Sequence, residues 1–320
     1  MSWFGSEIDG PLALTRAIHF AASAGIAGIL MFRGFVAEPA LRPSPEGYSV
    51  VRLRLAGLAW IALALTTATG LIWLVLQTMS IADLGWGDAV TSGAIWTVVN
   101  ETQFGLVAEV RAALAVLLAA CLLLDQMVLS RWLVLLAASA LVAAIAWTGH
   151  AGSTLGELGN LHLAADVLHL CAASAWIGGL AGLAILFEVG RHRPALEWRP
   201  LELDAISRFS ILGMISVAAL IVSGLLNTWI LVGSIRASLV TDYGRLLLLK
   251  IAAFAIMVAF AAVNRFWLTP RLVVTPKEAT DSSARSALRR NTLIEIALGL
   301  AIFAMVGVLG MLHPAIHLVQ

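Results

Sequence analysis

Eight long stretches of the chain are almost entirely apolar, and each is close to the length that crosses a lipid bilayer. They cover residues 12–36, 53–79, 104–125, 131–148, 161–188, 206–232, 244–268 and 290–313. About 20 apolar residues span the hydrocarbon core as a helix, because a helix satisfies its own backbone hydrogen bonds in lipid. The pattern therefore predicts an all-α polytopic integral membrane protein with eight transmembrane helices.

The composition agrees with this class. Of the 320 residues, 60% are hydrophobic and only 12% are charged, too few polar side chains to surround a water-soluble core. The formal net charge is +1 and the arginines lie in short loops, so we expect the lipid bilayer as a partner and no nucleic acid. The chain has no phosphate-binding loop and no nucleophile beside a base, so we expect no enzyme activity.

Lysine and arginine are concentrated in alternate connections. They flank the first, third, fifth and seventh connections, whereas residues 81–103 and 150–160 contain neither. Because basic loops stay in the cytoplasm, both termini are expected on the outer side of the membrane. Residues 1–10 have no basic residue before the first apolar segment, unlike a signal peptide, and are expected to be retained.

The two halves of the chain share several spaced patterns in the same order. The pairs are Thr102, Phe104, Gly105 and Arg111 with Thr241, Tyr243, Gly244 and Lys250; HFAASAGIAG from His19 with HLCAASAWIGG from His169; Thr69-Gly70-Leu71 with Ser223-Gly224-Leu225; and His150 with His313. This order predicts two parallel four-helix repeats, residues 1–150 and 151–320. They would be related by a pseudo-two-fold axis along the membrane normal.

The fifth apolar segment carries an ionisable stripe. His162, Asp166 and His169 are spaced i, i+4 and i+7, so they share one face of a helix. Ionisable groups inside a membrane indicate a functional site, although His162 alone is also explained by contact with the interface. Asp166 is either a metal ligand itself or a group that orients one of the imidazoles.

The repeat predicts that four histidines from the first, fourth, fifth and eighth helices share one outer cavity. They are His19, His150, His169 and His313. Imidazole binds copper, zinc, iron and nickel, and a thioether such as that of Met311 favours Cu(I). Two alternatives stay open: separate histidines that bind backbone or water, and a membrane b-type cytochrome in which paired histidines ligate haem.

Several stretches resemble the copper resistance protein D (CopD) family. They are TDYGRLLLLK at residues 241–250, AAVNR at 261–265, LTPRL at 268–272, HLCAASAWIGG at 169–179, residues 102–111 and WTGHA at 147–151. The resemblance implies a bacterial inner-membrane protein that moves copper ions from the periplasm towards the cytoplasm. It also implies a small periplasmic copper-binding protein as a partner. A further hypothesis is a non-transporting scaffold or sensor for such a partner.

Overall fold

The computed structural model describes residues 9–124, 128–274 and 278–318, so most of the N-terminal segment expected to be retained lies outside the described residues. The long helices are α1 (Gly10–Phe32), α3 (Pro45–Ala82), α6 (Gln103–Leu123), α7 (Val128–Ala143), α9 (Gly156–Gly190), α10 (Ala195–Val232), α12 (Asp242–Val263) and α14 (Glu278–Leu309). Within the described residues, eight helices are long and apolar enough to cross a membrane. The prediction of an all-α protein with eight spans is confirmed.

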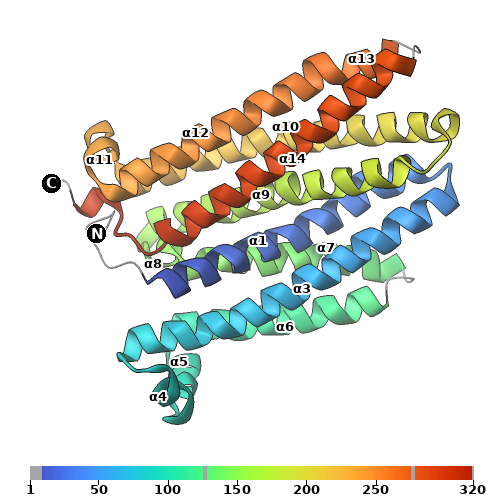
Figure 1. Cartoon of the computed structure of the whole chain (residues 1–320). Helices are drawn as coiled ribbons and strands as arrows, with labels where there is room; N and C mark the ends of the chain where they lie inside the picture. The colour runs from blue at the N-terminus through green and yellow to red at the C-terminus, as the bar shows by residue number, and fades with distance from the viewer. Residues whose placement is uncertain (1–8, 125–127, 275–277, 319–320) are drawn as a thin grey trace.

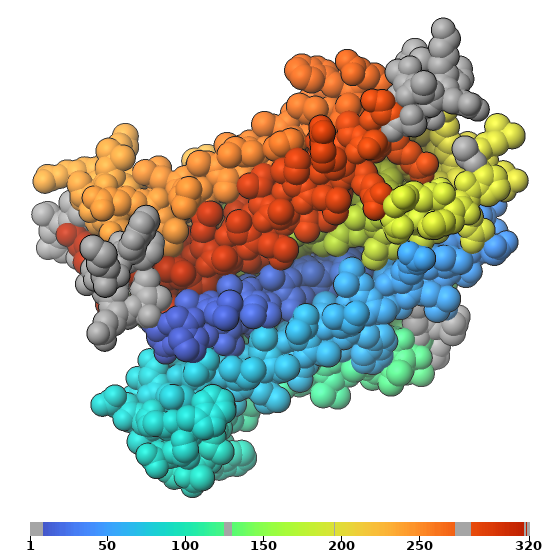
Figure 2. All heavy atoms as spheres, viewed as in Figure 1, coloured from blue at the N-terminus to red at the C-terminus, as the bar shows by residue number. Residues whose placement is uncertain are grey.

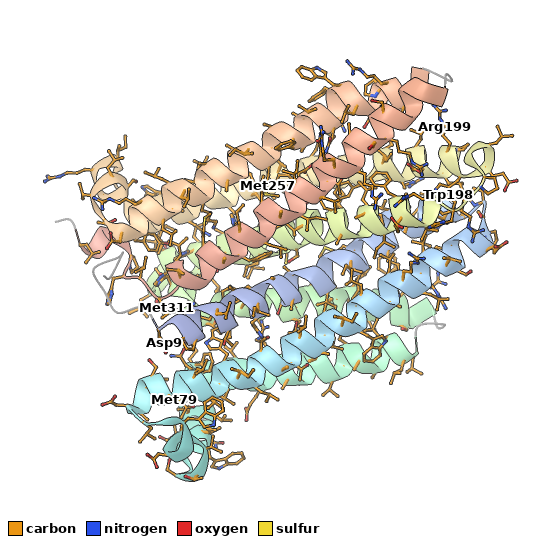
Figure 3. All side chains as sticks on the ribbon, in the orientation of Figure 1. Asp9, Met79, Trp198, Arg199, Met257 and Met311 are labelled. Carbon is orange, nitrogen blue, oxygen red and sulfur yellow. The ribbon has the colours of Figure 1, made fainter. Side chains whose placement is uncertain are left out.

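Shorter helices extend or connect the long ones. They are α2 (Glu38–Leu41), α4 (Trp86–Thr91), α5 (Ala94–Glu101), α8 (His150–Ser153), α11 (Ile235–Val240) and α13 (Thr269–Val274), with π turns η1 (Arg33–Ala37) and η3 (Asn264–Leu268) and 3₁₀ turns η2 (Ala144–Thr148) and η4 (Ala315–His317). In Figure 1, α1 begins and α14 ends at the same end of the bundle, which we call the outer end. Trp198 and Arg199 lie at the opposite, inner end (Figure 3).

Local sequence explains where the helices begin. The hydroxyls of Thr102 and Thr241 each accept a hydrogen bond at 3.0 Å from the amide three residues on, at Gly105 and Gly244. Such caps satisfy amides that the first helical turn leaves without partners. Both glycines also touch the backbone of the preceding short helix, where a Cβ would come within 2.6 Å of backbone atoms. The matching sequence patterns of the two halves therefore build the same helix start.

Some long helices continue beyond their apolar segments at the inner end. Helices α3, α10 and α14 begin two to three turns before the apolar residues that predict them. Ion pairs support these polar turns; Arg285 on α14 lies 2.5 Å from Glu202 on α10. At the outer end, α4 and α5 form a knob that projects from the bundle (Figure 2), with Trp86 and Trp96 exposed on it. Tryptophan is typical of the boundary between lipid and water.

Helices α1 and α9 form the centre of the bundle. They have the most buried spans, and they contact each other while α3 and α7 pack on α1 and α10 packs on α9. Their backbones touch at one crossing: a Cβ on Gly28 would lie 1.8 Å from the carbonyl oxygen of Ser174, and one on Gly178 would lie 2.6 Å from the Cα of Gly28. Small residues permit such close packing of membrane helices.

The crossing has matching partners in the two halves. Gly28 follows His19 by nine residues, and Gly178 follows His169 by nine residues. If a pseudo-two-fold axis passes through the crossing, equivalent positions of the two halves must contact each other there, as Gly28 and Gly178 do. The contact supports the two four-helix repeats, which stay a prediction together with their boundaries at residues 150 and 151.

Replacing Gly28 by Ala should lower the thermal unfolding temperature of the detergent-purified protein by several degrees. The new Cβ would overlap the α9 backbone, and overpacking of this kind costs about 1–3 kcal/mol. Gly25→Ala is the matched control on the same helix, because its Cβ would meet nothing within 4 Å. Equal unfolding temperatures for the two variants would show that the crossing does not hold the halves together.

Candidate functional site

Two histidines have matching surroundings on the central helices. The Nδ1 of His19 lies 3.0 Å from the hydroxyl of Thr69 on α3. The Nδ1 of His169 lies 3.0 Å from the hydroxyl of Ser223 on α10. Each hydroxyl donates its own hydrogen to a carbonyl oxygen of its helix at 2.6 Å, so it accepts a hydrogen from the imidazole. The network therefore places the proton of both rings on Nδ1 and the lone pair on Nε2.

In the first half, an arginine donates a hydrogen bond to the Nε2 of the histidine. The Nη2 of Arg111 on α6 lies 2.6 Å from the Nε2 of His19 and 3.1 Å from the hydroxyl of Ser23. The other arm of the guanidinium donates to the carbonyl oxygen of Leu141 at 2.7 Å. A metal ion would have to displace this buried cation to reach the Nε2 of His19, so the role of His19 as a ligand stays a prediction.

Aromatic rings enclose the same histidine. The ring of Trp73 packs edge-on against His19 with 5.3 Å between centroids, and the guanidinium of Arg16 lies 5.2 Å from the Trp73 ring. An adjoining cavity of about 210 Å³ between α3, α5 and α6 is lined mainly by apolar side chains, with His19 and Arg111 at its wall. Both features favour packing over ion binding in the first half.

In the second half, the corresponding positions carry different chemistry. Counting from the two histidines and from Thr69 and Ser223, Asp166 takes the place of Arg16 and Asn227 takes the place of Trp73. The Nδ2 of Asn227 donates to the carboxylate of Asp166 at 3.2 Å. Lys250 stands where the first half has Arg111, and its charge acts on both His169 and Asp166.

The lone pair of His169 is consequently open. Within the part of the chain that the structure describes, His169 makes one hydrogen bond, through Nδ1 to Ser223, and none through Nε2. An imidazole whose Nδ1 hydrogen is held by a neighbour and whose Nε2 has no hydrogen-bond partner has the arrangement found in metal-binding histidines. The two equivalent histidines thus differ at Nε2: that of His19 is bound by Arg111, and that of His169 has no hydrogen-bond partner among the described residues.

Two further histidines lie near the outer end of α9. The Nδ1 of His162 is 2.9 Å from the hydroxyl of Thr154, which donates to the carbonyl oxygen of His150 at 3.0 Å. This arrangement again leaves the lone pair on the Nε2 of His162. The Nε2 of His150 is buried and has no hydrogen-bond partner among the described residues. His150 is close enough to interact electrostatically with His162 on one side and with His313 on the other.

His150 is kept neutral by its surroundings. Burial lowers the pKa of His150 from its ordinary value, and the charges of Arg16 and His313 lower it further, against a hydrogen bond to the Leu309 backbone that raises it. A lowered pKa leaves the imidazole uncharged near neutral pH, which is the form that binds metal ions.

The structure therefore brings together only part of the predicted site. His162, Asp166 and His169 follow one another along α9, and His150 on α8 is linked to His162 through Thr154. His19 contacts α3 and α6 of the first half instead. His313 is exposed at the outer end, and Met311 packs at the same end against the apolar cluster of Leu12 and Phe20 (Figure 3). No group of three His, Cys, Asp or Glu side chains that could hold a metal ion forms among the described residues.

The sequence analysis missed Asn227 and a deeper polar cluster. Asn264 on the π turn η3 donates to the carboxylate of Glu295 at 2.7 Å and accepts from Asn291 at 2.8 Å, with both α14 residues buried. Comparison of residues 69–73 with 223–227 points to Asn227, because an amide replaces a tryptophan there. No sequence pattern points to the cluster around Asn264, since Asn264 is 27 residues from Asn291 and 31 from Glu295.

A membrane bundle with histidines and a carboxylate along one central helix has the features of a metal-handling membrane protein. The chain belongs to the copper resistance protein D family. Residues 203–309 match the family described as Copper resistance protein D, and residues 7–160 match Copper resistance protein D-like, N-terminal domain. The family resemblance of the sequence is confirmed.

Three relatives have related names. The inner membrane protein YebZ of Escherichia coli (strain K12) is 29% identical over 93% of this chain and 97% of its own. Copper resistance protein D of Pseudomonas syringae pv. tomato is 29% identical over 78% of this chain and 83% of its own. The copper transport protein CutJ of Bacillus subtilis (strain 168) is 31% identical over 72% of this chain and 41% of its own. No solved structure matches the chain.

Proposed function

We propose that the protein carries copper ions across the bacterial inner membrane, from the periplasm towards the cytoplasm, through its second half. The observation that carries the proposal is the difference between two equivalent histidines. Arg111 blocks the Nε2 of His19, whereas the Nε2 of His169 is open beside Asp166. Relatives named for copper resistance and copper transport support copper as the ion, and imidazole is a suitable copper ligand.

The ligands are arranged as successive stations along α9. His162 and His169 are seven residues apart, which places their Cα atoms about 10 Å apart along the helix. Because metal-to-nitrogen bonds are about 2 Å long, one ion does not readily bind both rings. We therefore assign an outer station to His150 and His162 and a deeper one to Asp166 and His169. Weak successive sites suit transport, since an ion must also leave each one.

The outer end is suited to collecting the ion. His313 and Met311 lie there beside the outer station, and they offer an exposed imidazole and a thioether. A small periplasmic copper-binding protein would deliver copper at this end. At the deeper station, the charge of Lys250 opposes that of a bound cation and shortens the time that copper stays there.

The geometry favours copper over haem. A bis-histidine haem needs two facing imidazoles with open Nε2 atoms, and the Nε2 of His19 already binds Arg111. A protein that only scaffolds or senses a periplasmic partner would need no open imidazole deep in α9. Copper analysis of the purified protein separates this hypothesis from transport.

His169→Ala and His19→Ala should have opposite effects. We expect His169→Ala to weaken copper binding at least tenfold with little change in unfolding temperature, because it removes an open ligand. His19→Ala should keep copper affinity but lower the unfolding temperature by several degrees, since Arg111 loses a buried partner. Chelator competition and thermal unfolding measure the two effects.

The control for these variants is His192→Ala, because His192 is exposed in the loop at the inner end. It should change neither quantity. Copper affinity for His169→Ala equal to that of the wild type would exclude the proposed site. If His19→Ala lost copper binding while its unfolding temperature stayed unchanged, His19 would be a copper ligand.

Copper binding should depend on pH in a way that reflects His150. Because its pKa is lowered, His150 stays neutral down to a pH below the ordinary imidazole value near 6.5, and protons compete for it only below that point. The difference in log affinity between wild type and His150→Ala should therefore be constant from pH 7.5 to 6.5 and shrink at lower pH. Competition titrations at pH 7.5, 6.5 and 5.5 measure it. A difference that shrinks already between pH 7.5 and 6.5 contradicts the assignment.

Two leucines test the orientation. Leu155 at the outer end is 89% exposed, and Leu196 at the inner end is 90% exposed. In a Cys121→Ala, Cys171→Ala background, a cysteine replacing Leu155 should react in whole cells with a thiol reagent that enters the periplasm but does not cross the inner membrane. A cysteine replacing Leu196 should react only after the membrane is opened. The reverse pattern would place the outer station on the cytoplasmic side.

A further inference from the structure

The inner end of the first half contains a basic cavity that the proposed copper path does not use. Its volume is about 310 Å³, and it lies between the end of α1, the π turn η1, the start of α3 and the start of α7. The charged side chains that line it are Arg33, Arg42, Arg52, Arg131 and Glu38. Four guanidiniums thus face a single carboxylate, so the cavity is suited to an anion.

The fold gathers these charges from several parts of the chain. Arg33 belongs to η1, Arg42 to the turn before α3, Arg52 to α3 and Arg131 to α7. The carboxylate of Glu38 lies 2.5 Å from the Nη1 of Arg131, and the four guanidiniums outnumber this single carboxylate. Guanidiniums have forked donors that match phosphate oxygens.

One wall of the same cavity is apolar and reaches the outside of the bundle. Phe35 is 51% exposed, Trp132 is 62% exposed, and Leu135 is partly buried beside them. Trp132 and Leu135 belong to the fourth span, Ser130–Thr148. Tryptophan at the end of a span is typical of the depth of lipid headgroups. The cavity therefore combines a cationic part with an apolar part that opens sideways.

We propose that this cavity binds an anionic phospholipid. The phosphodiester would lie among the guanidiniums, and the acyl chains would run along Phe35, Trp132 and Leu135. A free phosphate would use the arginines but leave the apolar wall without a role. Basic pockets between transmembrane helices on the cytoplasmic side commonly hold anionic lipid headgroups. The lipid would join the ends of α1, α3 and α7.

Native mass spectrometry of the detergent-purified full chain tests the proposal. With equimolar phosphatidylglycerol and phosphatidylcholine, the wild type should retain one phosphatidylglycerol in clear preference. Arg42→Gln should reduce this preference about fivefold, the usual effect of one basic residue near anionic lipid. Arg42 is exposed, so its replacement should leave the fold intact, which an unchanged unfolding temperature would verify.

Arg54→Gln is the matched control. Arg54 is also exposed and lies on the same helix as Arg52, but it does not line the cavity. It should keep the preference for phosphatidylglycerol. Equal retention of the two lipids by the wild type, or an equal loss in Arg42→Gln and Arg54→Gln, would overturn the proposal. Displacement of the lipid by millimolar inorganic phosphate alone would assign the cavity to a free anion instead.

Discussion

The contact between the backbones of α1 and α9 determines the rest of the structure. Because Gly28 and Gly178 have no side chains, the backbones of the two central helices touch. The other helices of the first half pack around α1, and those of the second half pack around α9. The histidines nine residues earlier on each helix are then held at corresponding places on opposite sides of the crossing. One imidazole faces α3 and α6, and the other faces α10, so each half builds its own environment.

The two environments give equivalent histidines different roles: hydrogen bonding that stabilises the fold in the first half, and a nitrogen available to a ligand in the second. The first half holds its histidine between the hydroxyl of Thr69 and the guanidinium of Arg111, so both ring nitrogens have a hydrogen-bond partner. The second half has an aspartate, an asparagine and a lysine at the matching positions, and it leaves a nitrogen open. An open imidazole in a membrane costs stability unless a ligand occupies it, so its retention is itself an argument for function.

Most of the fold could be predicted from the sequence, because spans and helix caps depend on local residues. Eight apolar segments give eight helices, and the threonines before Gly105 and Gly244 mark two helix starts. The convergence of His19 with His169 could not be judged, since spacing gives the face of a helix but not the neighbour that this face meets. Arg111 and Lys250 look interchangeable in the sequence, yet of the two only Arg111 hydrogen-bonds a histidine nitrogen within the described part of the chain.

The exchange of Arg111 for Lys250 has a consequence for charge balance. A guanidinium keeps its proton at any pH that a cell experiences, whereas an amine can release one when its surroundings change. The cation in the first half is therefore permanent, and the cation next to His169 is exchangeable. On the proposed copper path, release of a proton from Lys250 would offset the charge of an arriving metal ion, so that positive charge would not accumulate within the bilayer.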